Sequence, residues 1–459
     1  MPGGVLSMPI LYSDSYWNSC WASSQQLGSH LKGAILGAGL GRRLDPLTAY
    51  HLPKPLFPLG GKTPIAEIWL RRLIRSGIPE VSMNLCVLAD AMRRQFGNGA
   101  KYGVNLTYVE EATPTGTLGG VCKMALGRQA RSVEADSTIS SIDPFEGSTL
   151  IVPSGDIVAN FGPDLLEEIY GIHREKGAAL TMVLTEVPAS RKKDFGTVIL
   201  HSPETRAGQL SMSGKIVDFR EKDADSPSSL SNASIYIIER SLLELLDGFR
   251  TKAELGTENP FYDFGKHVFP AMLDKLPYIR LPKEFILWGV KFDGPWYDVG
   301  NKRDYLRVNE KVLDGVIKIP LTYEPLPWGY LGMNTSIDFS KVEIVPPVVI
   351  GNDCVIEAGA ALGPYAVVGD GWVVERGARI RNSVLWERYP YFAEGRQEIP
   401  MIDRRLVDRH EVRTGVRVFE SIVAGGCLRS DMIEQTVDVR EDGEMVALPI
   451  DYVPPDPRA

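Results

Sequence analysis

The chain has 459 residues, more than a single hydrophobic core usually supports, so we expect at least two domains. Its formal net charge of -8 argues against a nucleic-acid partner, because a duplex-binding surface normally needs clustered basic residues. No apolar run reaches the roughly 18 residues that a membrane-spanning helix requires.

Residues 1–31 lack the basic start and apolar run of a secretory signal, and their Ser, Gly and Trp content predicts a loose N-terminal extension. The alternative is that the start codon is assigned too early, with Met8 as another possible start. The chain contains five cysteines without a C-x-x-C pair, which favours free thiols over disulfides or structural zinc. A cytoplasmic location is therefore expected.

A glycine-rich turn follows the short apolar segment 33–36, which is typical of a buried first strand. Glycines let the backbone turn tightly with its N–H groups facing outward, and such groups bind anions. We expect this turn to contact nucleotide phosphates through Gly37, Ala38, Gly39 and Gly41.

Three basic side chains add positive charge to this turn. Arg42 and Arg43 follow the last glycine, and Lys54 stands between two prolines. Guanidinium and ammonium groups are the usual partners of phosphate. The dinucleotide fingerprint G-x-G-x-x-G and the P-loop pattern both fail here, because Arg42 and Leu56 stand where each requires a glycine.

The segments 37–48 (GAGLGRRLDPLT) and 53–55 (PKP) resemble the signature of the sugar-phosphate nucleotidyltransferases. Arg43 falls on the catalytic arginine of that family, and the resemblance also gives Lys54 a catalytic role. Two departures are visible: Arg42 replaces a small residue, and the spacer before Lys54 is about one residue longer than in many relatives.

Residues 110–120 (EEATPTGTLGG) follow a predicted strand and resemble the base-binding loop of the family. The resemblance implies nucleotide contacts from Glu111, Gly116 and Thr117. A carboxylate such as Glu111 could accept both Watson–Crick donors of guanine. The alternative is an ordinary helix N-terminus.

Two aspartates are candidate Mg²⁺ ligands. Asp156 ends the segment 149–156 (TLIVPSGD), a predicted apolar strand that finishes in Gly-Asp, and Asp298 lies in the segment 296–300 (WYDVG), which resembles the second metal motif of the family. Carboxylates are suitable ligands for Mg²⁺, which shares its coordination with substrate phosphates. A turn or N-cap role is the alternative for Asp156.

Three further residues are assigned to the sugar phosphate by resemblance. Glu221 could accept hydrogen bonds from sugar hydroxyls, and Lys222 could neutralise the phosphate. Asn232 begins the segment NASIY, in which Ser234 replaces the family's glycine. Without the surrounding pattern, a Glu-Lys pair would be no more than a solvated surface feature.

Alternating strand and helix patterns predict an α/β fold with a mixed, mainly parallel, Rossmann-like sheet over residues 32–310. A six-residue period then predicts a parallel β-helix over 341–440, left-handed by resemblance, rather than a sandwich. Its expected inward positions are Ile350, Ile356, Leu362, Val368, Val374 and Ile380. We expect a linker at 311–340, an inserted loop near 387–411 and a C-terminal tail at 441–459.

The resemblance implies transfer of a nucleotidyl group from an NTP to a sugar 1-phosphate, with release of pyrophosphate. Mannose-1-phosphate guanylyltransferase, with GTP, is the expected activity. The alternatives are adenylyl-, uridylyl- or thymidylyltransfer to glucose 1-phosphate, or an inactive regulatory subunit. We also expect Mg²⁺ as cofactor and a homo-oligomer formed through the β-helix.

Overall fold

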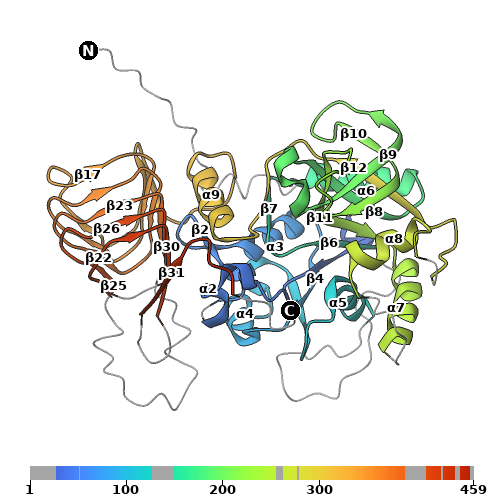
Figure 1. Ribbon diagram of the computed structural model, residues 1–459, viewed down its shortest axis with the longest axis horizontal. Coiled ribbons are helices and arrows are strands. Elements are labelled where there is room, and N and C mark those ends of the chain that lie inside the picture. Colours follow the sequence, from blue (N-terminus) through green and yellow to red (C-terminus); the bar gives the residue numbers. More distant parts are fainter. Residues whose placement is uncertain are drawn as a thin grey trace. The chain divides into compact units, whose positions relative to one another are not determined.

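The computed structural model describes residues 27–50, 52–126, 149–254, 262–276, 279–387, 410–424, 427–439 and 445–454 (Figure 1). The chain divides into two compact units. The first unit comprises the described residues of 41–65 and 297–459, and the second comprises those of 21–40 and 66–296. Most of the predicted extension and of the predicted inserted loop lies outside the described residues.

The second unit is built on a nine-stranded mixed sheet in the order β5-β4-β1-β6-β11-β8-β12-β10-β9. Strands β5, β4, β1 and β6 are parallel, so their carboxyl ends share one edge. The bounds are β1 (Leu31–Ile35), β4 (Glu80–Leu85), β5 (Asn105–Glu110), β6 (Thr149–Pro153), β8 (Ala178–Glu186), β9 (Gly196–Thr205), β10 (Met212–Glu221), β11 (Leu230–Ile238) and β12 (Ile286–Lys291). The short strands β7 (Ile157–Ala159) and β13 (Trp296–Asp298) lie outside this sheet.

Helices pack around this sheet, as the alternating sequence pattern predicts. Helix α5 packs on β1, β4 and β5, while α6 and α7 pack on β8. The bounds are α3 (Ile65–Arg75), α4 (Ala89–Phe96), α5 (Gly116–Ala125), α6 (Pro163–Glu175), α7 (Arg240–Glu254) and α8 (Phe269–Met272). None of the helices in the described part of the chain is long and apolar enough to cross a membrane.

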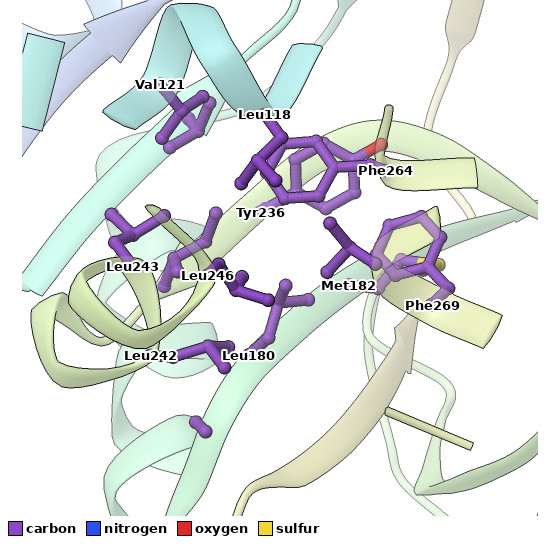
Figure 2. Packing of buried hydrophobic residues seen from close by; sticks show 14 of the residues in the cluster. Leu118, Val121, Leu180, Met182, Tyr236, Leu242, Leu243, Leu246, Phe264 and Phe269 are labelled. Carbon is purple, nitrogen blue, oxygen red and sulfur yellow. The ribbon is translucent and has the colours of Figure 1, made fainter. Parts of the chain in front are cut away.

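The main core of the second unit joins α5, α7 and α8 to the sheet (Figure 2). Leu118 and Val121 of α5 face the core, together with Tyr236 of β11 and Phe269 of α8. Each of these side chains is less than a tenth exposed. Because α5 begins at Gly116, this packing also fixes the second half of the predicted base-binding loop, which lies in the first turns of the helix.

The first unit contains a parallel β-helix, which confirms the interpretation of the six-residue period. Three sheets of short strands run along it, and strands of successive coils pair in parallel, as Val348 pairs with Ala366. All six predicted inward residues belong to its core. A sandwich would require antiparallel sheets, so that alternative is wrong.

The first sheet of the β-helix contains β14 (Glu324–Leu326), β15 (Gly329–Leu331), β18 (Val348–Ile350), β21 (Ala366–Val368), β24 (Ser383–Leu385), β27 (Ile422–Val423), β30 (Gln435–Val439) and β31 (Met445–Pro449). The second contains β16 (Ser336–Ile337), β19 (Val355–Ile356), β22 (Trp372–Val374), β25 (His410–Val412) and β28 (Cys427–Leu428). The third contains β17 (Glu343–Ile344), β20 (Ala361–Leu362), β23 (Arg379–Arg381), β26 (Arg417–Phe419) and β29 (Met432–Ile433).

Two predicted boundaries need correction. The expected linker 311–340 contains β15 and β16, which pair in register with β18 and β19, so the first coil begins before residue 341. The expected tail contains β31, which pairs antiparallel with β30. These segments lack the six-residue period, and their pairing depends on contacts with neighbouring coils.

The outer side of the first β-helix sheet is also apolar and buried. Val349, Val367 and Val384 point away from the β-helix core, yet each is at most 1% exposed. Helix α9 (Lys302–Leu313) packs against β24. The segment around β2 (Pro58–Leu59) and β3 (Thr63–Pro64) belongs to the same unit.

An aromatic cluster joins these parts of the first unit. The Phe57 ring lies 4.8 Å from that of Trp386 and 5.4 Å from that of Tyr305 on α9, both edge-to-face. Trp386 Nε1 donates to the Tyr305 hydroxyl, which donates to the Pro58 carbonyl. The segment that follows the glycine turn is therefore held against α9 and the β-helix.

A partly buried polar network lies beside this cluster. Lys62 Nζ is 2.8 Å from Asp370 Oδ2 and 3.8 Å from Glu387 Oε2. The Tyr323 hydroxyl and the Asn352 backbone N–H both donate to Asp370 Oδ1. The carboxyl of Glu387 has less polar support, and burial raises its pKa to about 7 while Lys62 opposes the rise.

We predict that this raised pKa makes stability depend on pH. Because the folded pKa lies above the unfolded value of about 4.3, the folded state binds the proton more tightly. The Glu387 contribution is therefore present below about pH 4 and is lost as the pH rises through 7. Glu387→Gln should flatten the dependence of Tm between pH 5 and 8, measured by calorimetry.

The matched control is Glu324→Gln, at an exposed glutamate of β14. It should keep the parental dependence of Tm on pH. Equal slopes for the parent and the Glu387 variant would contradict the prediction.

Candidate active site

Three predicted site residues lie together in the first unit. Lys54 Nζ is 3.6 Å from Asp298 Oδ1, and both side chains are less than a fifth exposed. A Cβ atom built on Gly300 would stand 3.1 Å from Asp298 Oδ2 and 3.4 Å from Arg43 Nη2. The structure thus brings two cations and one carboxylate around Gly300, although they come from three separate sequence segments.

Arg43 is carried by a short turn of 3-10 helix, η2 (Arg42–Leu44). Gly41 precedes it with φ 61, a left-handed conformation that favours glycine. The Leu44 N–H donates to the Gly41 carbonyl, which closes the turn. Arg42 is half-buried and Arg43 is exposed, so Arg43 has the more accessible guanidinium.

The second unit contains the first part of the glycine turn. Gly37 and Ala38 are buried at the carboxyl end of β1, whereas Gly39 is exposed. A Cβ atom built on Gly39 would have no atom of the described chain within 4 Å. Glycine at this position therefore leaves open space beside the backbone, as close approach of a phosphate requires.

A relay of hydrogen bonds links this turn to two neighbouring strands. The Gly37 N–H donates to Asn84 Oδ1 at 2.7 Å, and Asn84 Nδ2 donates to Glu111 Oε1 at 2.7 Å. The Thr115 N–H and hydroxyl each lie 2.7 Å from Glu111 Oε2. Gly120 gives the relay room, because a Cβ atom there would stand 2.4 Å from Asn84 Nδ2.

This geometry argues against the expected contact between Glu111 and a guanine base. Glu111 is 2% exposed, and both of its carboxylate oxygens accept hydrogen bonds from within the protein. A carboxylate held in this way orders the loop rather than facing a ligand. Glu111 is therefore a supporting residue of the predicted base-binding loop.

Sequence reasoning missed Asn84, which is 3% exposed near the end of the apolar strand β4. The available signal was a lone amide at the carboxyl end of a predicted strand, where ligands of parallel sheets bind.

The predicted loop residues Gly116 and Thr117 are fixed by packing as well. Gly116 has φ 73, and a Cβ atom there would stand 2.3 Å from the Tyr262 carbonyl oxygen. Thr117 Oγ1 accepts a hydrogen bond from the Phe264 N–H. Both residues therefore have a structural reason for their identity, besides any contact with a nucleotide.

Asp156 follows β6 at the same edge of the sheet and is half-buried. The Ser154 hydroxyl donates to Asp156 Oδ1 at 2.6 Å, and the Gly155 N–H donates to the Leu36 carbonyl beside the glycine turn. Within the described ranges, no three His, Cys, Asp or Glu side chains gather as a metal-binding group. The two predicted metal aspartates belong to different units.

The residues assigned to the sugar phosphate lie on the other half of the sheet in the second unit. Glu221 and Lys222 are exposed at the end of β10, and Lys222 has φ 54. Left-handed backbone at a non-glycine residue is uncommon and is enriched at functional sites. A Cβ atom built on Gly265 would stand 2.6 Å from Glu221 Oε2, so this glycine makes room for the carboxylate.

Asn232 is half-buried at an irregular point of β11. Its Oδ1 accepts from the Ser234 N–H at 2.9 Å, and its Nδ2 donates to the Tyr236 hydroxyl at 2.8 Å. Ser234, which replaces the family's glycine, has φ 57. Asn232 therefore stabilises the left-handed turn at Ser234, in addition to its predicted contact with the sugar.

A model of the nucleotidyl transferase family matches residues 32–315. This range covers more than half of the chain and contains every predicted site residue. The chain therefore belongs to the nucleotidyl transferase family. The resemblance found in the sequence is confirmed, and so is the fold that it implied.

Curated relatives of this nucleotidyl transferase differ in their named substrates. A UTP–glucose-1-phosphate uridylyltransferase of Synechocystis is 29% identical, over 90% of this chain and 96% of the relative. A mannose-1-phosphate guanylyltransferase of Mycobacterium tuberculosis is 27% identical, over 77% and 82%. A glucose-1-phosphate adenylyltransferase of Fervidobacterium nodosum is 24% identical, over 77% and 78%.

We predict that Asn84→Ala weakens nucleotide binding. The substitution removes a hydrogen-bond partner from the Gly37 N–H and from Glu111, and buried polar groups left unpaired cost about 1–3 kcal/mol each. NTP affinity, measured by isothermal titration calorimetry, should fall about tenfold or more.

The control is Asn105→Ala on β5, where the exposed amide donates to Glu80 Oε2 at 2.9 Å. Its NTP affinity should equal that of the parent. An Asn84 variant that is folded and binds NTP as well as the control does would show that the relay has no bearing on the nucleotide.

Proposed function

We propose that the protein transfers a nucleotidyl group from an NTP to a sugar 1-phosphate and releases pyrophosphate. The observation that carries this proposal is the grouping of Arg43, Lys54 and Asp298 around Gly300 within a nucleotidyl transferase. Two cations beside a carboxylate suit a triphosphate, whose negative charge shifts as pyrophosphate leaves.

In this proposal, a phosphate oxygen of the sugar 1-phosphate attacks the α-phosphorus of the NTP in line. The attacking group is already anionic, so no general base is needed, and positioning and charge neutralisation supply the rate. Arg43 and Lys54 neutralise the triphosphate. Lys222 orients the sugar phosphate, while Glu221 and Asn232 contact the sugar.

Mg²⁺ fits the chemistry of the residues present. It is usually held by one or two carboxylates together with substrate phosphates, so a group of three protein ligands is not required. Asp156 and Asp298 are the proposed ligands. When bound, Mg²⁺ would neutralise phosphate charge during transfer.

An inactive regulatory subunit is the alternative from another class of function. Such a protein could lose its charged groups without consequence. Here Arg43, Lys54, Asp156, Lys222 and Asp298 are all present, and the first, second and last of them lie together. This arrangement favours an enzyme.

Two substrate pairs are candidates. Mannose 1-phosphate with GTP is supported by several relatives that are named mannose-1-phosphate guanylyltransferase. Glucose 1-phosphate with UTP is supported by a relative that is matched over 96% of its length. The physical argument for guanine depended on Glu111, which is buried and occupied, so we favour UTP with glucose 1-phosphate.

We further propose a cytoplasmic homo-oligomer assembled through the β-helix. The described cysteines Cys86, Cys122, Cys354 and Cys427 form no disulfide, which fits a reducing compartment. Light scattering on the full chain at micromolar concentration tests the assembly, and a monomer would contradict it.

The substrate proposal predicts the outcome of a pyrophosphate-release assay. Purified protein with Mg²⁺ would be given GTP, ATP, UTP or dTTP, each with mannose or glucose 1-phosphate. We expect the highest kcat/KM for UTP with glucose 1-phosphate, and a tenfold preference corresponds to about 1.4 kcal/mol. A preference for GTP with mannose 1-phosphate would restore the guanine assignment, and no release with any pair would contradict the enzyme itself.

The metal proposal predicts that Asp156→Asn and Asp298→Asn each abolish most turnover. Each substitution removes an anionic oxygen ligand with little change in size. NTP binding should also lose its dependence on Mg²⁺, which calorimetry with and without the metal would detect. Asp164→Asn, at an exposed aspartate in the first turn of α6, serves as the control and should retain parental values.

A further inference from the structure

One lysine of the first unit is fully buried and has no role in the function proposed above. Lys302, the first residue of α9, is 1% exposed. Its Nζ donates to the Asp45 carbonyl oxygen at 2.7 Å and to the Tyr452 carbonyl oxygen at 2.6 Å. The same atom lies 5.9 Å from the centre of the Tyr452 ring.

Burial of this charged ammonium group is unfavourable, so its presence in the core needs a structural or functional reason. Removing a lysine from water disfavours its charged form. Burial lowers the pKa of Lys302 to about 8, against the opposing charges of Asp45 and Asp451. Its hydrogen bonds to two backbone carbonyls offset part of that cost and fix the two carbonyls in space.

The first carbonyl belongs to the turn that carries Arg43. Asp45 ends η2, and its N–H donates to the Arg42 carbonyl at 3.1 Å. The Thr48 hydroxyl lies 2.7 Å from Asp45 Oδ1. Lys302 therefore holds the carboxyl end of the turn whose middle residue is Arg43.

Lys302 is itself anchored next to Asp298. It lies two residues after Gly300, the glycine against which Arg43 and Asp298 approach. Asn301 caps α9, because its Oδ1 accepts from the Asp304 N–H at 2.9 Å. The position of the ammonium is thus set by the beginning of a well-capped helix.

The second carbonyl belongs to the C-terminal arm, which we define as residues 445–454. The arm begins with β31, and the Ile450 N–H then donates to the Glu434 carbonyl of the last coil. Arg303, beside Lys302, forms a two-atom ion pair with Asp451, with both N–O distances at 2.6 Å. Two consecutive residues of α9 therefore bind two consecutive residues of the arm.

We propose that Lys302 is a positioning residue for the reaction, and that it clamps the Arg43 turn to the C-terminal arm. This inference rests on the proposed function, since it gives Arg43 its role at the triphosphate. It assigns the end of the β-helix a part in catalysis: the arm completes the coordination of the lysine that holds the turn. The arm acts through Lys302 and contacts no substrate in this account.

The first test compares two lysines of the same helix. Lys302→Met keeps the length of the side chain and removes its donors, whereas Lys311→Met removes a lysine that bonds to Asp314 at the end of α9. We expect Lys302→Met to lower kcat/KM for the NTP roughly ten- to a hundredfold. KM for the sugar 1-phosphate should stay parental, and Lys311→Met should change neither.

A double-mutant cycle separates positioning of Arg43 from general damage. In an Arg43→Lys background, adding Lys302→Met should cost much less than it does in the parent, because both changes act through the same guanidinium. A chain that ends at Pro449, with β31 retained, should reproduce part of the Lys302→Met loss and should add little to it. The proposal would be overturned if Lys302→Met lowered kcat/KM by the same factor in the Arg43→Lys background, or in the chain that ends at Pro449, as it does in the parent.

Amide hydrogen exchange provides a readout that does not depend on activity. The N–H groups of Leu44 and Asp45 should exchange faster in Lys302→Met than in Lys311→Met, while those of β18 and β21 should be unchanged. Unchanged exchange at Leu44 and Asp45 would overturn the clamp even in an active enzyme. If exchange is faster in Lys302→Met but the parent releases no pyrophosphate, the clamp is confirmed, its role in positioning for the reaction is overturned, and the proposed function is contradicted separately.

Discussion

The architecture of the first unit depends on an apolar surface that a β-helix alone would leave exposed. Val349, Val367 and Val384 line the outer side of one β-helix sheet, and the unit buries them completely. Each buried valine is worth roughly 1.5–3 kcal/mol, so this side of the sheet has to be covered. Helix α9 packs against this sheet at β24, and Phe57 packs against Trp386, which follows β24. Helix α9 begins four residues after Asp298, and Phe57 lies three residues after Lys54. The hydrophobic requirement of the β-helix therefore also holds part of the candidate site in place.

This constraint changes the meaning of the domain boundary. The sequence predicts a nucleotidyltransferase domain over 32–310 and a separate β-helix after a linker, because their periodicities differ. Compactness divides the chain differently, since residues 41–65 and α9 belong with the β-helix. Pattern analysis finds segments of regular structure, but which segments share a core is decided by long-range packing that has no local period.

The same reasoning explains which site residues could be predicted. The inward positions of the β-helix, such as Ile356 and Val374, follow a fixed spacing and were all identified correctly. Arg43, Lys54 and Asp298 could be found because their motifs resemble a family, and the structure brings them together. Asn84 could not be found in that way, because one amide in an apolar strand acquires its meaning only when Gly37 and Glu111 reach it from other strands.

Buried polar groups that bind the backbone are the common element of both units. In the second unit, Asn84 Oδ1 accepts a hydrogen bond from the Gly37 N–H, and in the first unit Lys302 donates to the Asp45 carbonyl. A buried polar group without a partner is costly, so each such contact strongly favours one local arrangement of the chain. In both units the residue fixed in this way belongs to the glycine-rich segment that the proposed function assigns to the triphosphate. Loops made of glycine gain close approach at the cost of conformational entropy, and a single buried donor or acceptor from a rigid strand or helix restores the order that the glycines give up.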